Sequence, residues 1–361
     1  MFLELAVETR LIIAVLFSFA LSFLLRYPIY KIAMKKECYE KANGRSSHTG
    51  SIPNVGGVIV FASFVTTSFL FVKFISPDVQ YIFLASSMAF ALGLYDDLLV
   101  ISFKKKFVGE IIGAVFLMLG HVYFTNFHGL FGYYELSIYF SIPFTIFVVV
   151  GLVNALNLID GIDGLCSGLS ALIIPSFSVW FIQNGHTEYA IIGFSIASSI
   201  IPFFLQNIFS KKKKMFLGDN GSLFLGMILS FIVIKFTELS IGDNPWMDVS
   251  NAPAVAFSFL AIPVMDTLRV MITRVFKGTS PFTPDKRHFH HRLLYLYNGN
   301  HKKSTFTLLG IQLLFIILGI IGSKLTNELL ITITIVMFLS IYLFVLLLYL
   351  KKEIRENKQL S

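Results

Sequence analysis

Long apolar stretches alternate with short polar segments along the whole chain. A helix that crosses the hydrocarbon core of a bilayer needs about 20 consecutive apolar residues, because it rises about 1.5 Å per residue. The pattern therefore predicts an all-α, polytopic membrane protein with eleven transmembrane helices. The expected spans are 11–33, 55–75, 79–95, 107–124, 137–152, 164–183, 188–207, 222–236, 252–275, 307–322 and 329–350.

The composition excludes an ordinary soluble enzyme. Of the 361 residues, 55% are hydrophobic and 14% are charged, whereas about a quarter of the residues in a soluble domain are charged. No connecting segment is long enough for a separate soluble domain, so we expect a single integral membrane domain over residues 1–361. The first span lacks a basic leader and a cleavage site, so we expect it to be retained.

Basic residues lie mainly in alternate connecting segments. The opposite set of connections carries only Arg10 and Lys324. By the positive-inside rule, the basic set is cytoplasmic, with the N-terminus outside and the C-terminus inside. The basic runs also serve as anchors beside anionic lipid. This predicted cytoplasmic set comprises 35–54, 96–106, 153–163, 208–221, 276–306 and the C-terminal tail, and we expect the first five to form the active site.

Most aspartates lie on the same predicted side as the basic residues. Carboxylates concentrated among cations indicate a divalent metal and a phosphorylated substrate at the cytoplasmic face. Asp266 lies inside the ninth span, and we expect it to form an intramembrane ion pair with Arg269. The acids on the cytoplasmic side are Asp96, Asp97, Asp160, Asp163, Asp219 and Asp285.

The segment from 154 to 165, NALNLIDGIDGL, places four polar side chains between two long apolar runs. Such groups are costly to desolvate, so the pattern favours a functional site. The alternative is a capped hairpin broken by glycines, which explains one aspartate but leaves the others unexplained. The four side chains are Asn154, Asn157, Asp160 and Asp163.

Asp96 and Asp97 end the third span as adjacent carboxylates, which repel each other. Such a pair is tolerated best beside a cation or a metal. A run of three lysines follows a few residues later and offers partners for phosphate. These are Lys104, Lys105 and Lys106. The alternative is a charged helix end, but acids at a helix C-terminus oppose the helix dipole.

The segment 211–222, KKKKMFLGDNGS, precedes the eighth span. We expect Asp219, Asn220 or Ser222 to cap the new helix, whose free N–H groups can bind an anion. Asp219 is a metal-ligand candidate, because a carboxylate can hold Mg²⁺ that bridges to phosphate. Phe216 is either an interfacial anchor or a platform on which a base stacks.

The first cytoplasmic loop contains RSSHTGSIPNVGG at 45–57, whose glycines and proline predict a shaped loop. Arg45 and His48 could meet an anion there; the alternative is a solvated turn.

The loop from 279 to 294 carries histidines at three of four consecutive positions. They could bind zinc, but the oxygen-rich residues elsewhere favour a harder metal. Arginines on both sides fit a diphosphate better. The basic residues before and within this cluster are Arg287, His288, His290 and His291.

Together these motifs resemble those of the polyprenyl-phosphate N-acetylhexosamine-1-phosphate transferases. The similarity covers roughly residues 10–350 and rests on SIPNVGG, YDD, NALNLIDGIDGL, FLGDNGS and HFHH in that order. The phospho-MurNAc-pentapeptide branch of the family carries three consecutive histidines. The sequence His288-Phe289-His290-His291 instead looks like the branch that transfers N-acetylglucosamine 1-phosphate.

The resemblance implies Mg²⁺, or Mn²⁺ as a substitute, bound by Asp219 near Asn157. It implies that Phe216 stacks on uracil and that Lys106, with Lys104 and Lys105 as alternatives, follows the acidic pair near the lipid phosphate. The implied catalytic residues are Asp96, Asp97, Asn157, Asp160, Asp163 and His288. The implied substrate contacts are Arg45, His48, Lys106, Asn154, Phe216, Asn220, Arg287, His290 and His291.

The implied reaction transfers N-acetylglucosamine 1-phosphate from UDP-GlcNAc, or a related UDP-N-acetylhexosamine, to undecaprenyl phosphate, with release of UMP. This step initiates cell-surface polysaccharide synthesis at the cytoplasmic face of the inner or plasma membrane. Membrane lipid is an expected partner, nucleic acid is not, and a homodimer fits the family. The alternatives are phospho-MurNAc-pentapeptide transfer and a polytopic transporter, which would place its polar groups near the midplane.

Overall fold

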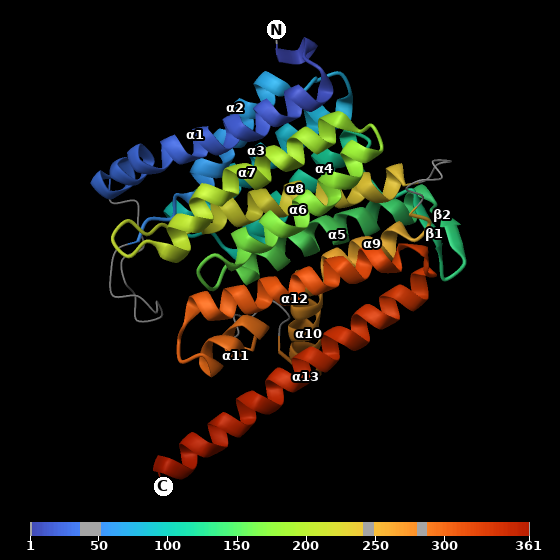
Figure 1. The fold of residues 1–361 in the computed structure, drawn as a ribbon. Helices are drawn as coiled ribbons and strands as arrows, with labels where there is room; N and C mark the ends of the chain where they lie inside the picture. Colours follow the sequence, from blue (N-terminus) through green and yellow to red (C-terminus); the bar gives the residue numbers. More distant parts are fainter. Residues whose placement is uncertain (1, 37–51, 241–248, 280–286, 361) are drawn as a thin grey trace.

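The computed structural model describes residues 2–36, 52–240, 249–279 and 287–360, and nearly all of them are helical (Figure 1). The α-helices are α1 (Val7–Lys35), α2 (Gly56–Phe71), α3 (Pro77–Leu99), α4 (Phe103–Leu119), α5 (Ile138–Ile159), α6 (Leu165–Gln183), α7 (Thr187–Phe209), α8 (Gly218–Leu239), α9 (Ala252–Phe259), α10 (Ala261–Phe276), α11 (Phe289–Leu296), α12 (His301–Ile321) and α13 (Asn327–Leu360). Short 3₁₀ helices are η1 (Phe2–Glu4) and η2 (Gly322–Lys324).

Each of the eleven predicted spans overlaps a helix or helix pair. Within the described ranges, eight helices are long and apolar enough to cross a membrane, and the bent pair α9–α10 makes up to nine. The shorter α2 and α4 have 16 and 17 residues. The protein is therefore a polytopic all-α membrane protein. Which ends of the helices face the cytoplasm stays a prediction.

The ninth span differs from the prediction of one continuous helix. It is broken at Leu260, where α9 and α10 meet at 80°. Pro263 has no N–H for the Phe259 carbonyl, and the Gln312 amide nitrogen donates to that carbonyl instead, at 2.9 Å. The Gln312 oxygen in turn accepts from the Ile262 N–H at 3.2 Å. The side chain of α12 thus satisfies the backbone groups that the bend exposes.

The core of the bundle is α8, which is buried along almost its whole length. The helices α2, α3, α5 and α6 pack around it. Its first turn is approached unusually closely: a Cβ on Gly57 would lie 2.3 Å from the Gly221 nitrogen, and one on Gly93 would lie 2.3 Å from the Asp219 carbonyl oxygen. Only glycine allows these backbones to come so near.

The two ends of the bundle differ. At one end, a small antiparallel hairpin pairs β1 (Asn126–Leu130) with β2 (Tyr133–Glu135), between α4 and α5. At the other end lie α11 and the N-terminal end of α12 (Figure 1). We call these the hairpin end and the α11 end. The long α13 leaves the hairpin end and extends past the rest of the bundle (Figure 1).

Candidate active site

The α11 end brings together motifs that are far apart in the sequence. The described part of the SIPNVGG motif, from Ile52 onward, lies beside the start of the FLGDNGS motif. The Phe216 N–H donates to the Pro53 carbonyl at 3.0 Å, and the Gly56 and Gly57 N–H groups donate to the Phe216 and Leu217 carbonyls at 2.9 Å. The first motif therefore holds the start of α8 in place.

A cluster of charged and amide side chains surrounds Asp219 in the first turn of α8. One carboxylate oxygen accepts from the Asn157 amide at 2.9 Å, and the other accepts from the Lys106 ammonium. Lys106 also donates to Asp96 at 3.0 Å and to the Asn157 oxygen at 3.4 Å. Four predicted site residues thus meet at one point, and Lys106 is the member of the lysine run that reaches it.

The same cluster shows the donor set of a cation site. Three oxygen atoms, from Asp96, Asn157 and Asp219, converge on the Lys106 ammonium. Carboxylate and amide oxygens are also the ligands of hard divalent ions, and Mg²⁺ commonly takes only one or two carboxylates beside substrate phosphates. Among the described residues, no group of three or more His, Cys, Asp and Glu side chains could hold a metal alone. The zinc alternative for the histidines therefore gains no support.

Asp97 faces a different direction from Asp96. Its Oδ1 accepts from the Asp219 N–H at 3.1 Å and from the Asn54 amide at 3.3 Å. Its Oδ2 accepts from the Asn220 N–H at 2.9 Å and from the Asn220 side chain. Asp97 therefore caps α8 from another helix, so the prediction that Asp219, Asn220 or Ser222 caps it was wrong. The N-cap residue itself, Leu217, makes no side-chain capping bond.

The turn between α5 and α6 holds two aspartates in unlike surroundings. Asp163 pairs with Lys214 at 2.6 Å and with His301 at 3.2 Å. Burial opposes its charge, but hydrogen bonds and charges from His301 and Lys214 outweigh burial and lower the pKa of Asp163 below its usual value. Within the described residues, no hydrogen bond reaches the Asp160 carboxylate. Burial, and then the negative charges of Asp219, Asp97 and Asp163, raise the pKa of Asp160 well above its usual value.

The histidine loop forms α11 and packs against the same turn. A Cβ on Gly161 would lie 2.7 Å from the His290 Nε2, so the histidine ring covers that glycine. Burial, and then the charge of His291, lower the pKa of His290 to about 3, which keeps this ring neutral. The His288 Nδ1 lies 3.0 Å from Asp266. Asp266 also pairs with Arg269 at 2.7 Å, which confirms the predicted ion pair.

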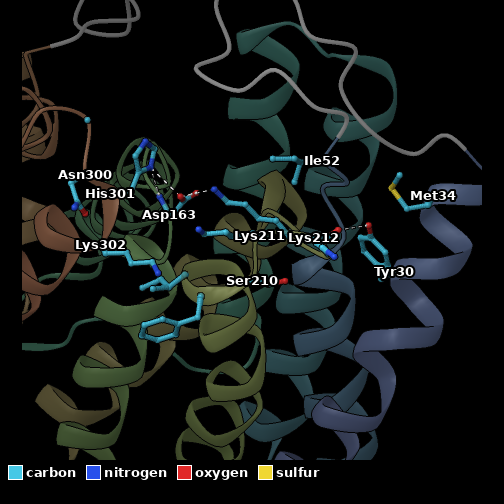
Figure 2. A pocket seen from close by; sticks show the side chains of 14 residues that line it. Tyr30, Met34, Ile52, Asp163, Ser210, Lys211, Lys212, Asn300, His301 and Lys302 are labelled. Atoms are coloured by element: carbon cyan, nitrogen blue, oxygen red, sulfur yellow. Dashed lines mark hydrogen bonds and ion pairs between the residues drawn. The ribbon is translucent and has the colours of Figure 1, made fainter.

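An open cavity of about 830 Å³ lies beside Asp163, where the ends of α1, α7 and α12 meet (Figure 2). Its polar lining is strongly basic, and a cation from its rim, Lys214, lies 5.4 Å from the centre of the Phe216 ring. Such a volume is typical of small-molecule sites. The basic side chains that line the cavity are Lys211, Lys212, Lys214, His301 and Lys302.

Some predicted residues lie elsewhere. Arg45 and His48 fall outside the described residues. Asn154 does not join the Asp219 cluster; its amide donates to Glu110 and to the Val150 carbonyl. Sequence reasoning missed Glu110, although a lone carboxylate inside the apolar span 107–124 was a usable signal.

Comparisons with known proteins identify the family of this chain. Residues 79–237 match the model of glycosyl transferase family 4. The chain is 33% identical to the undecaprenyl-phosphate alpha-N-acetylglucosaminyl 1-phosphate transferase of Yersinia pestis, over 89% of this chain and 86% of that one. The protein of the same name from Escherichia coli (strain K12) is 33% identical over 80% of this chain and 77% of its own length.

A more distant relative is the probable undecaprenyl-phosphate N-acetylglucosaminyl 1-phosphate transferase of Bacillus subtilis (strain 168), which is 27% identical over 86% of this chain and 85% of that one. The similarity to these proteins covers most of the chain. The chain therefore belongs to glycosyl transferase family 4, in the group of undecaprenyl-phosphate N-acetylglucosaminyl 1-phosphate transferases.

Proposed function

We propose that the protein transfers N-acetylglucosamine 1-phosphate from UDP-GlcNAc to undecaprenyl phosphate. The observation that carries this proposal is the cluster of Asp96, Lys106, Asn157 and Asp219. It combines a cation for phosphate with oxygen ligands for a metal, beside a basic cavity. The names of the relatives supply the donor sugar and the lipid acceptor.

The chemistry requires two anions to meet. An oxygen of the lipid phosphate attacks the β-phosphorus of the donor, the bridging P–O bond of the diphosphate breaks, and UMP leaves. A phosphate monoester is mostly dianionic at pH 7, since its second pKa is about 6. It therefore needs little help from a general base, and catalysis consists mainly of neutralising charge and aligning the reactants.

Lys106 and the first turn of α8 supply that alignment. Lys106 is the cation placed to approach a phosphate oxygen, and Asp96 and Asp219 fix its position. We favour a direct displacement over a route through a carboxylate nucleophile. Both oxygens of Asp97 are already engaged by donors from Asn54, Asp219 and Asn220, which supports a positioning role for Asp97 rather than attack on phosphorus.

The donor set of Asp219 and Asn157 fits Mg²⁺, with Mn²⁺ as a substitute. When bound, such an ion withdraws negative charge from the diphosphate oxygens. The side chains of the protein complete the site, because they hold the two substrates in the orientation that the transfer requires and prevent other orientations.

The cavity in Figure 2 is the proposed site of the donor nucleotide. Its lysines would attract the diphosphate, and Phe216, which lies near the lining residue Lys214, would stack on the uracil. The histidines of α11 would contact the diphosphate or the sugar from the other side of the Asp160–Asp163 turn. The α11 end would face the cytoplasm at the inner or plasma membrane, where a soluble donor meets a lipid acceptor. A homodimer stays a prediction for this chain.

The test uses the purified full chain in lipid nanodiscs with UDP-GlcNAc, undecaprenyl phosphate and Mg²⁺. We expect UMP and the lipid-diphosphate sugar to appear in equal amounts, and Asp219→Ala to abolish both. Asp78→Asn is the control, because Asp78 is also an aspartate paired with a lysine but lies at the hairpin end, in the first turn of α3. A panel of UDP-sugars that includes UDP-MurNAc-pentapeptide separates the branches. No UMP release with any of these donors would refute the proposed transfer.

A further inference from the structure

Asp266 in α10 is a buried carboxylate with an unusually complete set of partners. It is 1% exposed. Its oxygens accept from the Arg269 guanidinium at 2.7 Å and from the Phe289 N–H at 3.1 Å, and its Oδ2 lies 3.0 Å from the His288 Nδ1. A charge buried to this degree is tolerated only when it is paired and hydrogen-bonded. All of these partners belong either to α10 or to the start of the histidine motif.

The contact with Asp266 fixes the state of the His288 ring. An ionised carboxylate only accepts hydrogen bonds, so the proton of this bond lies on the His288 Nδ1. The Nε2 on the far side of the ring is buried and has no partner within the described residues. A buried nitrogen without a hydrogen-bond partner costs free energy. A group of the bound ligand would supply the partner that Nε2 lacks.

The position of His290 shows where the His288 ring lies in the site. The rings of His288 and His290 are nearly parallel, with centroids 5.6 Å apart. The His290 Nε2 is likewise buried without a partner in the described parts of the chain, and it lies against Gly161. The His290 ring therefore lies against the Asp160–Asp163 turn, and the His288 ring stacks beside it.

Arg269 holds Asp266 itself in place. Besides the carboxylate, it donates to the Arg287 carbonyl at 2.7 Å and to the Tyr342 hydroxyl at 2.9 Å. Its guanidinium also stacks over the Tyr342 ring at 4.1 Å. One arginine thus joins α10, α13 and the residue that precedes His288, which leaves Asp266 little freedom to turn away from His288.

We propose that Asp266 is a positioning residue, which holds His288 with Nδ1 protonated so that Nε2 faces a hydroxyl or amide group of the sugar-nucleotide donor. This inference rests on the proposed function, because it places the donor's diphosphate or sugar against α11. A carboxylate behind an imidazole fixes the tautomer and the orientation of the ring, so Nε2 is the nitrogen left to meet the donor. Asp266 touches no substrate and acts through His288.

A double-mutant cycle tests this coupling on the full chain in nanodiscs, with UMP release as the readout. Asp266→Asn keeps the size of the side chain and an acceptor for the Phe289 N–H. We expect it to lower kcat about 10- to 100-fold, the usual range for a group that orients another ligand. If Asp266 acts through His288, adding Asp266→Asn to His288→Gln should cost little more than His288→Gln alone.

Asp78→Asn is the control, because Asp78 is also buried and paired, with Lys235 at 2.8 Å, but lies at the hairpin end. Its effect should multiply with that of His288→Gln. Losses for Asp266→Asn and His288→Gln that multiply in full would overturn the positioning role and leave the proposed transfer intact.

A second measurement requires neither activity nor an Asp266 variant. Nitrogen NMR of ¹⁵N-histidine-labelled wild-type protein reports which ring nitrogen of His288 carries a proton, with His288→Gln used to assign the signal. We expect a protonated Nδ1. A bare Nδ1 in the wild type would overturn the inference. A protonated Nδ1 in a protein that releases no UMP would support the Asp266–His288 pair while the proposed transfer failed.

Discussion

Asp97 and Asp266 perform the same structural task in two parts of the site. Each is a carboxylate of one helix that caps the start of another: Asp97 accepts from N–H groups of α8, and Asp266 accepts from the first N–H of α11. In each case the capped helix carries the motif with the proposed chemistry. The positions of Asp219 and His288 therefore depend on side chains from helices outside their own motifs.

The two aspartates differ in how their charge is balanced. Asp266 has Arg269 in direct contact and His288 beside it. The hydrogen bonds to Asp97 come from backbone N–H groups and amides, and its neighbour Asp219 is itself an acid. The cation on that side is Lys106, which contacts Asp96 and Asp219. The charge of Asp266 is therefore neutralised by its direct neighbours, whereas the Asp97 region keeps a net negative charge and is suited to bind a further cation.

After Asp219→Ala, the largest effect is expected from the cation of the Asp97 region. Lys106→Met leaves Asp96 and Asp219 without their shared partner and removes the group placed to meet a phosphate. We expect kcat for UMP release to fall by about 10³-fold, in the range found when one group that stabilises transition-state charge is removed. Lys105→Met is the matched control, since Lys105 is exposed in the same run. Equal losses for both variants would mean that the run acts only as a general electrostatic attractor.

Asp97→Asn should have the next largest effect. The new amide keeps one acceptor oxygen but turns an NH2 donor toward the N–H group of either Asp219 or Asn220, so the first turn of α8 should shift. A displacement of about 1 Å in an active site can cost about 10²-fold in rate. We expect that loss in kcat, together with faster hydrogen exchange at the Asp219 and Asn220 amides.

Hydrogen exchange distinguishes an Asp97 that holds α8 in position from an Asp97 that takes part in the reaction. A general base that does not hold α8 would lose activity on mutation without any change in amide exchange. Asp78→Asn, at the opposite end of α3, should leave the exchange of both amides unchanged. This prediction distinguishes a positioning carboxylate from a reacting one.

Much of the site could be predicted because its residues are polar groups at the ends of apolar spans. Asp219, Asn157 and Lys106 carry that signal in the sequence, and the structure brings them into one cluster. The same pattern gave the eleven helical segments, because each is a long apolar stretch. Periodicity and hydropathy indicate whether a residue lies in the apolar interior of the membrane or in a polar connection. These site residues lie at the boundary between the two.

The supporting contacts could not be predicted, because they depend on which helices pack together. Asp97 and Asn220 are 123 positions apart, and no spacing rule links them. The bend at Leu260 could be suspected from Pro263, but its stability depends on Gln312 of α12. Asp266 was expected to pair with Arg269, a neighbour on one helix, whereas its contacts with His288 and Phe289 cross to α11.

The third prediction concerns stability in the Asp266 region. Arg269→Gln removes the guanidinium that neutralises Asp266, and breaking a buried ion pair from one side costs about 3 kcal/mol. We expect thermal unfolding in detergent to occur at a clearly lower temperature. Arg355→Gln, at an exposed arginine of α13, serves as the control and should not change it. An unchanged midpoint for Arg269→Gln would show that His288 alone can balance the buried carboxylate.

Asp163 provides the smallest effect and extends the comparison to a partly exposed aspartate with its own partners, Lys214 and His301. Its pKa is lowered in the folded protein, so this pairing stabilises the fold above the unfolded-state pKa of about 3.9. The contribution should disappear as the pH falls through the lower folded-state value. Because the group is partly exposed, we expect a difference on the order of 1 kcal/mol between wild type and Asp163→Asn at pH 6 to 7. The two melting curves should approach each other toward pH 3. A difference that persists there would assign the stabilisation to packing, and would separate Asp163 from aspartates that act through their charge.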